Sequence, residues 1–215
     1  NVSFDNNMLS WDAVKGAVKY QVLKNGKESA TLTATSTAVV KGPYAEYQVI
    51  ALDSAGVPSF ASEPVQVSAD KFVKIFEMET FAPKEPLPYK GFTGQGFVEI
   101  TKQKNASLSI KVNVPEAGLY ALDFRYANGN GPTNTENKCA IRTLKNADQV
   151  IGTLVFPQRG KGEWSDWGYS NPVKIKLEKG ATTLSLVFMP ANENMNGEIN
   201  QALLDHLRLI KLEAN

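Results

Sequence analysis

The sequence has almost no cysteine or histidine. Cys139 is the only cysteine and His206 the only histidine among 215 residues. A single thiol excludes an internal disulfide and a thiolate metal cluster, so we expect Cys139 to be a buried, inert side chain. Neighbours in a strand point to opposite faces, so we do not expect Asp205 and His206 to form a catalytic pair.

Charge of one sign and long apolar runs are also missing. The 23 basic residues nearly balance the 22 acidic ones, for a formal net charge of +1. Such a chain has no field that draws nucleic acid or anionic lipid, and we expect neither partner. No stretch approaches the ~18–20 apolar residues of a membrane span, and the opening NVSFDNNMLSW is no signal peptide. We expect the chain to begin inside a longer secreted, periplasmic or cell-surface protein, so that the export signal and any catalytic domain would lie upstream of Asn1.

What the sequence does have is a series of short β-branched and aromatic runs, bounded by Gly, Pro, Asn or Asp and spaced about 8–12 residues apart. The runs are YQVLKNG, TAVVKG, AEYQVIALD, SLSIKVNV, YALDFRYAN, VKIKLEKG and TTLSLVF. Asn25-Gly26 predicts a tight hairpin turn, and ALLDHLRLI near the C-terminus reads as a last strand. The pattern predicts an all-β protein made of antiparallel sandwiches.

The composition changes near residues 68–73, where the strand-like EPVQVS gives way to SADK and then to FVKIFEMETF. We predict two domains, residues 1–70 and residues 71–215. The first resembles a fibronectin type III domain through LSW, AVKYQV, YQVIALD and the Gly-Ser segment that follows. That resemblance implies an immunoglobulin-like sandwich with Trp11, Tyr20 and Tyr47 in its core, and a spacer role.

Two acidic residues open the second domain. Glu77 and Glu79 would share one face of a strand, because the side-chain period is two, and such a like-charged pair is costly without a cation or basic partner. Ca²⁺ held by oxygen ligands, with Asp205 adding another, is one explanation. The other is a solvated face on which both acids lie opposite lysines such as Lys74 or Lys211.

The ordered motifs FEMETF, GFTGQGFVEI, SLSIKVNVPEAGLYALDFRYANG, GEWSDWGYSNPVKIKLEKGATTLSLVF and LLDHLRLIKL span essentially all of this domain. Together they resemble the carbohydrate-binding modules of families 6 and 35. The resemblance implies a galactose-binding-like jelly-roll sandwich carried by a secreted polysaccharide-degrading enzyme. It also implies that Glu77, Glu79 and Asp205 bind a structural calcium ion.

A sugar ring stacks its apolar face on an aromatic ring and needs amides or carboxylates for its hydroxyls. Trp164 lies in a loop of small and polar residues, and we expect it to be the platform, while Trp167 enters the core. The resemblance singles out Asn128, in the loop ANGNGPTNTEN, as a sugar ligand. The alternative is that Trp164 packs in the core and Asn128 only makes a turn.

The sequence departs from the related modules at Leu203, where they often carry an asparagine that faces the ligand. Asn200 or Asn196 would have to take its place. Arg142 and Arg159 could pair with a uronic acid carboxylate. A module without sugar binding, packed as a structural domain on a hydrolase or lyase catalytic domain, is therefore the alternative function.

Catalysis needs an activated nucleophile or two carboxylates set across a bond. Glu163 and Asp166 could imitate such a pair, but loops on a small sandwich rarely supply one. We therefore expect a non-catalytic, carbohydrate-binding accessory region of a glycan-degrading enzyme, with polysaccharide and the upstream catalytic domain as its partners.

If the boundary is right, limited proteolysis of the chain cuts between Ser68 and Lys71 and leaves two folded pieces, because domain linkers make few contacts. Mass spectrometry of the fragments checks the position. Resistance at this point, combined with a single cooperative unfolding transition, would contradict the division.

Overall fold

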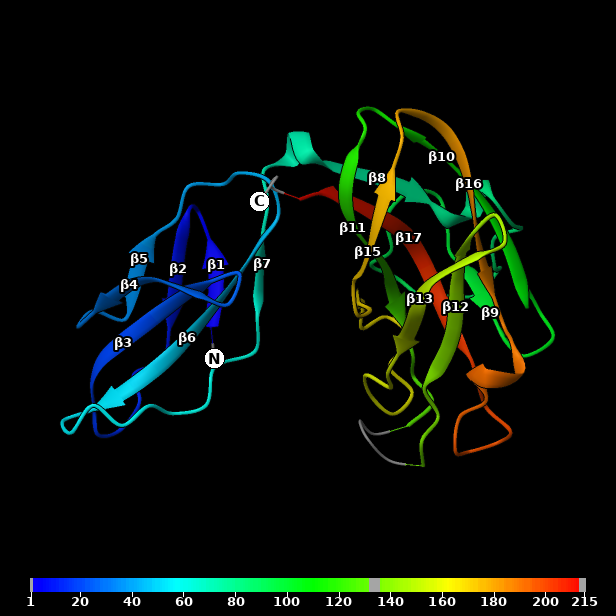
Figure 1. Cartoon of the computed structure of the whole chain (residues 1–215). Helices are drawn as coiled ribbons and strands as arrows, with labels where there is room; N and C mark the ends of the chain where they lie inside the picture. The colour runs from blue at the N-terminus through cyan, green and yellow to red at the C-terminus, as the bar shows by residue number, and fades with distance from the viewer. Residues whose placement is uncertain (1, 132–135, 213–215) are drawn as a thin grey trace. The chain divides into compact units, whose positions relative to one another are not determined.

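The computed structural model describes residues 2–131 and 136–212 (Figure 1). Within them the chain divides into two compact units, residues 2–73 with 210–212 and Lys74–Leu209. Every described strand pair with a printed register is antiparallel, and the remaining regular structure is limited to short 3-10 turns. None of the described helices is long and apolar enough to cross a membrane. The all-β fold class is confirmed.

The first unit is a sandwich of a three-stranded and a four-stranded sheet. One sheet contains β1 (Val2–Asp5), β2 (Met8–Trp11) and β5 (Ser36–Ala38); the other contains β4 (Lys27–Leu32), β3 (Ala17–Lys24), β6 (Ala45–Asp53) and β7 (Val65–Val67). Asn25 and Gly26 form the predicted hairpin turn, with φ values of 51° and 77°. Trp11, Tyr20 and Tyr47 lie in the core as expected. The resemblance to fibronectin type III itself stays a prediction.

The second unit is a larger sandwich. Its first sheet has the order β10 (Ser107–Val114), β16 (Gly180–Val187), β12 (Ala140–Asn146) and β13 (Gln149–Phe156). Its second sheet has the order β14 (Gly168–Tyr169), β11 (Gly118–Ala127), β17 (Ala202–Lys211) and β8 (Val73–Glu77), with β15 (Val173–Leu177) on β11 and β9 (Val98–Ile100) on β17. The expected strand at the C-terminus is present as β17. The β12–β13 hairpin was not among the predicted runs.

The core of the second unit follows from strand alternation. In β10 every second residue is buried, so Leu108, Ile110 and Val112 face inward and the residues between them face solvent. Residues from both sheets contribute to the same apolar cluster. Burying one face of each sheet against the other is what holds the two layers together.

Strand β17 departs from simple alternation. It is buried along nearly its whole length, and its core positions are Ala202 and Leu204, then Leu207 and Leu209. The inward phase therefore shifts by one residue between Leu204 and Leu207, as an extra residue in a β-bulge would do. The two residues between them fall together outside that core cluster, so the expectation that Asp205 and His206 point to opposite faces was wrong.

The stretch Glu77-Met78-Glu79 is not a continuous strand either. Strand β8 ends at Glu77, and Met78–Thr80 forms a 3-10 turn, η2, in which Met78 is completely buried. The Thr80 hydroxyl donates to the Glu77 carbonyl oxygen at 2.7 Å and holds the turn. Glu79 therefore reaches its position through a turn, and not through strand alternation.

Candidate functional site

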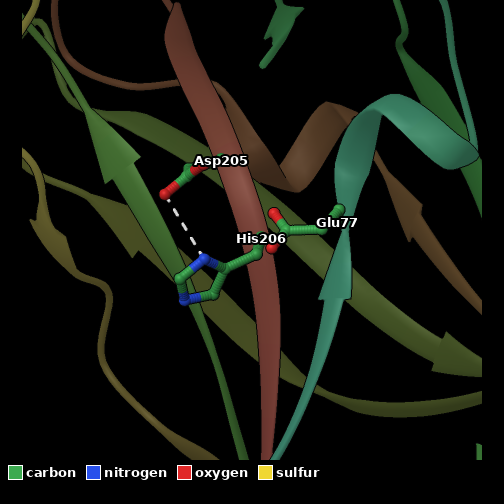
Figure 2. Close-up of side chains that lie close together, drawn as sticks. All are labelled: Glu77, Asp205 and His206. Atoms are coloured by element: carbon green, nitrogen blue, oxygen red, sulfur yellow. Dashed lines mark ion pairs between the residues drawn. The ribbon is translucent and has the colours of Figure 1, made fainter. Parts of the chain in front are cut away.

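A cluster of ionisable side chains lies where β8 meets β17. A carboxylate oxygen of Glu77, one of Asp205 and a ring nitrogen of His206 all lie within 4.8 Å of one another. Figure 2 shows Glu77 reaching toward the other two from the neighbouring strand. We call these three residues, with Glu79 beside them, the carboxylate cluster.

Thr93, from the long segment before β9, sits at the centre of this cluster. Its hydroxyl lies 3.0 Å from Glu77 Oε2 and 2.8 Å from His206 Nδ1. Its backbone N–H donates to Asp205 Oδ1 at 2.9 Å. One threonine thus fixes the positions of side chains from two strands.

Glu79 approaches the same segment from the η2 turn. Its Oε1 accepts a hydrogen bond from the Gln95 N–H at 2.6 Å, whereas its Oε2 is buried with no hydrogen-bond partner among the described residues. Gly94 makes this approach possible, because it has a φ of +61° and an added Cβ would lie 2.4 Å from Glu79 Oε1. Glu77 and Glu79 therefore both lie against Gly94. The three side chains with donor atoms within 4.8 Å of one another are Glu77, Asp205 and His206, whereas the sequence predicted Glu77, Glu79 and Asp205.

Two carboxylates of the cluster, Asp205 and Glu77, have pKa values that are shifted in opposite directions. Although burial acts to raise the pKa of Asp205, hydrogen bonds from His206 and Arg125 hold that pKa below its usual value. Arg125 Nη1 lies 2.5 Å from Asp205 Oδ2. Burial raises the pKa of Glu77 and outweighs the hydrogen bond from Thr93 and the influence of His206, which act to lower it. A cation beside Glu77 and the unpartnered oxygen of Glu79 would remove this cost, so the donor set fits a divalent ion.

A second cluster, of aromatic and apolar side chains, lies in the same unit. Phe97, Ala127 and Leu203 are buried, and Tyr89, Phe92, Trp164 and Trp167 pack against them while only partly buried. The Trp164 and Tyr89 rings are stacked, with centroids 6.1 Å apart and planes inclined by 24°. We call these two rings the aromatic pair.

Gly129 lies in close contact with the indole ring of Trp164. A Cβ added to Gly129 would lie 2.7 Å from Trp164 Nε1, so the indole lies directly against the backbone there. Trp164 is consequently neither a free loop side chain nor a core residue. Trp167 packs against the same apolar cluster and donates from Nε1 to the Lys90 carbonyl oxygen at 2.7 Å.

Asn128 does not face solvent. Its side chain is completely buried and donates to the carbonyl oxygens of Lys138 and Phe156, at 3.2 and 3.0 Å. Its Oδ1 accepts from both the backbone N–H and the amide of Asn130. These bonds occupy the amide and give Asn128 a structural role, and its contact with sugar stays a prediction. Asn134, from the same loop, lies outside the described residues.

Asn200 is also internal. It is 2% exposed, and its Oδ1 accepts from the Ile141 N–H at 3.0 Å and from Arg142 Nη1 at 2.5 Å. Arg142 is itself completely buried, and desolvation lowers its pKa to about 10. Asn200 and Arg142 therefore serve as each other's buried partners, and a contact of either with a ligand stays a prediction.

The other candidates lie nearer the surface. Glu163 and Asp166 are exposed, and Asp166 Oδ1 pairs with Arg159 Nη2 at 3.1 Å. Cys139 is only partly buried, in contrast to the expectation, although burial still raises its pKa.

No family model matches the chain. It is 35% identical over 123 residues to a cycloisomaltooligosaccharide glucanotransferase of Niallia circulans. The aligned region covers 57% of this chain and 11% of that protein. It is 30% identical over 97 residues to mannan endo-1,4-beta-mannosidase A of a Piromyces species, and the aligned region covers 45% of this chain and 14% of that protein. The chain thus spans a small fraction of the curated relatives it matches.

Among solved structures, the chain is similar to the CBM35 from Cellvibrio japonicus Abf62, with 18% identity and a TM-score of 0.46 over 66% of this chain and 94% of that one. It is also similar to a cycloisomaltooligosaccharide glucanotransferase from a Paenibacillus species, with 25% identity and a TM-score of 0.47 over 62% of this chain and 18% of that one. These TM-scores are low, and the fold assignment rests on the sheets and core described above.

The burial of Asn128 predicts an effect on stability. Asn128→Ala removes an amide that makes several buried hydrogen bonds and leaves partners unsatisfied, so we expect it to lower the free energy of unfolding by about 1–3 kcal/mol or more. Urea denaturation of the whole chain measures this. Asn113→Ala, on an exposed position of β10, is the control and should change it by less than about 0.5 kcal/mol. Equal effects of the two changes would contradict the buried role.

Proposed function

We propose that the chain is a non-catalytic, carbohydrate-binding accessory region of a secreted glycan-processing enzyme. The observation that carries this proposal is the partly exposed aromatic pair, Tyr89 and Trp164, on the second unit. Flat rings at a surface provide the apolar contact that a pyranose ring needs. The names of the relatives add support, because they are enzymes that act on or build glycans and the matched region is a small part of each.

Two backbone hydrogen bonds join the loop that carries Trp164 to residues 128 and 129. The Arg159 N–H donates to the Asn128 carbonyl oxygen and the Gly162 N–H to the Gly129 carbonyl oxygen, both at 2.9 Å. Asn128 therefore helps to position the loop through its backbone carbonyl oxygen. Directional hydrogen bonds to sugar hydroxyls then come from exposed side chains of the loop, such as Lys161 and Glu163.

Trp164→Ala tests the platform. Since stacking on an aromatic ring contributes ~0.5–1.5 kcal/mol beyond area burial, affinity for oligosaccharide should fall by about tenfold or more. Isothermal titration against isomalto-, manno-, xylo-, galacto- and uronic acid-containing oligosaccharides provides the measurement. Met195→Ala, which is 88% exposed on another loop, is the control.

The same variant separates the platform from a core role. A partly buried ring should cost less stability than the ~3–5 kcal/mol typical of a core tryptophan. A loss in that range, with sugar affinity unchanged, would sink the platform assignment.

We also propose that Glu77, Glu79 and Asp205 hold a structural Ca²⁺. The proposal is supported by the convergence of oxygen donors, the buried unpartnered Oε2 of Glu79 and the raised pKa of Glu77. Calcium takes 6–8 oxygen ligands, so backbone oxygens or water would complete its shell. The ion would stabilise the folded unit, because it binds only where these side chains are brought together.

Chelation should therefore lower the melting temperature of the second unit in the wild-type chain, and excess calcium should restore it. Glu77→Gln should abolish that response. In chelator, the same variant should be at least as stable as wild type at neutral pH. Burial raises the pKa of Glu77 in the folded state above its value in the unfolded chain. When the pH rises above that unfolded-state pKa, ionising Glu77 lowers the free energy of unfolding. The neutral glutamine side chain of the variant does not ionise and therefore avoids this loss of stability.

Differential scanning calorimetry in EDTA and in millimolar CaCl₂ makes the comparison, with exposed Glu178→Gln as the control. A wild-type transition that is identical in both buffers would rule out the calcium site.

A structural accessory domain is the second candidate. It is favoured by the burial of Leu203, Asn128 and Asn200, which leaves three expected ligand positions inside the protein. Absence of binding to every glycan in the titration, together with stable association of the chain with a catalytic domain of the same protein, would select it.

A further inference from the structure

Beside strand β6, the edge of the first unit is incomplete. β7 pairs only with Ala45–Tyr47, the first three residues of β6, and residues 59–64 have no strand structure. The Ser59 N–H donates to the Ala51 carbonyl oxygen at 2.9 Å, and the Ser59 hydroxyl accepts from the Ala51 N–H at 3.0 Å. Ser62 makes the same two hydrogen bonds to Val49, at the same distances. Serine residues therefore bond to the part of β6 that β7 leaves open.

A cavity of about 190 Å³ lies against this serine segment. Three aromatic and three polar side chains contribute to its wall: Trp11, Tyr20, Phe60, Asp12, Ser59 and Ser62. Trp11 and Tyr20 belong to the core of the unit, with ring centroids 5.7 Å apart. Phe60 is 100% exposed, which is the largest exposed fraction among the described large apolar side chains. The cavity therefore combines a solvent-exposed ring with the aromatic core.

Trp11 contains a hydrogen-bond donor that the protein leaves unsatisfied. Its Nε1 is buried with no hydrogen-bond partner among the described residues. Nearly all buried N–H groups in folded proteins have a partner, so an exception calls for an explanation such as a bound molecule. Because the indole is part of the cavity wall, a ligand with an acceptor oxygen can supply the partner after a small movement of the ring.

The polar groups of the wall fit a molecule that carries hydroxyl groups. Each serine hydroxyl accepts one N–H and donates to one carbonyl oxygen, that of Phe60 or Glu63, and so retains one acceptor lone pair. Asp12 adds a carboxylate acceptor, whereas Trp11 adds a donor, and a hydroxyl group can bond to both kinds. None of the described residues that line the cavity is basic, so an anionic ligand would find no counter-ion there.

The volume of the cavity limits the size of the ligand. It is below the ~300–1,000 Å³ of sites for drug-sized molecules and suits a single ring. We propose that the cavity of the first unit binds one uncharged pyranose residue of a glycan, with the apolar face of the sugar against Trp11 and Phe60 and its hydroxyls toward the polar wall. The choice of a glycan rests on the proposed function, whereas the site is separate from the aromatic pair of the second unit.

The indole signals of the full chain report where a sugar binds. The chain has three tryptophans, so a ¹H–¹⁵N spectrum contains three indole signals, of which Trp11→Phe and Trp164→Ala each identify one. The titrants are the methyl glycosides of glucose, galactose, mannose and xylose, with glucuronic acid as the charged comparison. At least one uncharged sugar should move the Trp11 signal, and to the same extent in Trp164→Ala. Glucuronic acid should move it much less.

Phe60→Ala tests the cavity itself. Because the ring is fully exposed, its removal should leave the unfolding transition nearly unchanged. The sugar that moves the Trp11 signal should bind about two- to tenfold more weakly, which is the effect of losing one aromatic contact. Val40→Ala is the matched control, since Val40 is 91% exposed on the same unit and does not line the cavity.

The outcomes are distinct. If the Trp164 signal moves and the Trp11 signal does not, this inference is overturned and the proposed function stands. Trp11 shifts that disappear in Trp164→Ala, or that Phe60→Ala does not weaken, place the ligand outside the cavity and also overturn it. Equal binding of glucuronic acid overturns the choice of an uncharged sugar. If neither signal moves with these sugars or with the oligosaccharides named above, both proposals fail.

Discussion

The ion pair between Arg125 and the completely buried Asp205 is the interaction on which the site region of the second unit depends. Removing a carboxylate from water is costly unless charge and hydrogen bonds replace the lost solvation. Arg125 supplies the charge at 2.5 Å, and the Thr93 N–H supplies a further hydrogen bond. The segment before β9 is thereby fixed to the central strand, which brings Gly94 and Gln95 against Glu79.

The same arginine links the carboxylate cluster to the aromatic pair. Its Nη2 donates to the Gly91 carbonyl oxygen at 3.0 Å, and its guanidinium lies 5.6 Å from the Trp167 ring centroid. Trp167 in turn donates to the Lys90 carbonyl oxygen, while the Lys90 N–H donates to the Ser165 hydroxyl. A contiguous set of contacts therefore runs from Asp205 to the residue beside Trp164. A cation at the proposed site would therefore stabilise the segments that support the aromatic pair.

Much of this architecture could be predicted from local pattern. The alternation of apolar and polar residues predicted β6 and β10, and Asn25-Gly26 predicted the hairpin turn that follows β3. Glu77 and Glu79 were recognisable as two acidic residues in an otherwise apolar segment. The predictions failed where tertiary contacts override the period of two. The phase shift in β17 brings Asp205 and His206 together, and the η2 turn carries Glu79. The burial of Asn128 and Asn200 could not be predicted, because the sequence around an asparagine is the same whether its amide makes a turn or joins a buried hydrogen-bond network.

The burial of those two amides changes what kind of binding this unit can support. Discrimination among sugars comes from buried polar groups that a wrong ligand leaves unpaired. Here Leu203 packs in the apolar cluster that contacts Trp164, while the buried amides of Asn128 and Asn200 are engaged in hydrogen bonds within the protein. In the proposed function, the aromatic pair, rimmed by exposed loop side chains, would give mainly apolar contact, so its affinity for a single sugar ring would be low and tolerant of substituents. In the proposed function, tethering to an enzyme would offset this weakness, because a second, intramolecular contact gains from effective concentration and needs no tight site. Under the proposed function, this arrangement would therefore suit a module that holds an enzyme near its glycan better than one that selects a particular sugar.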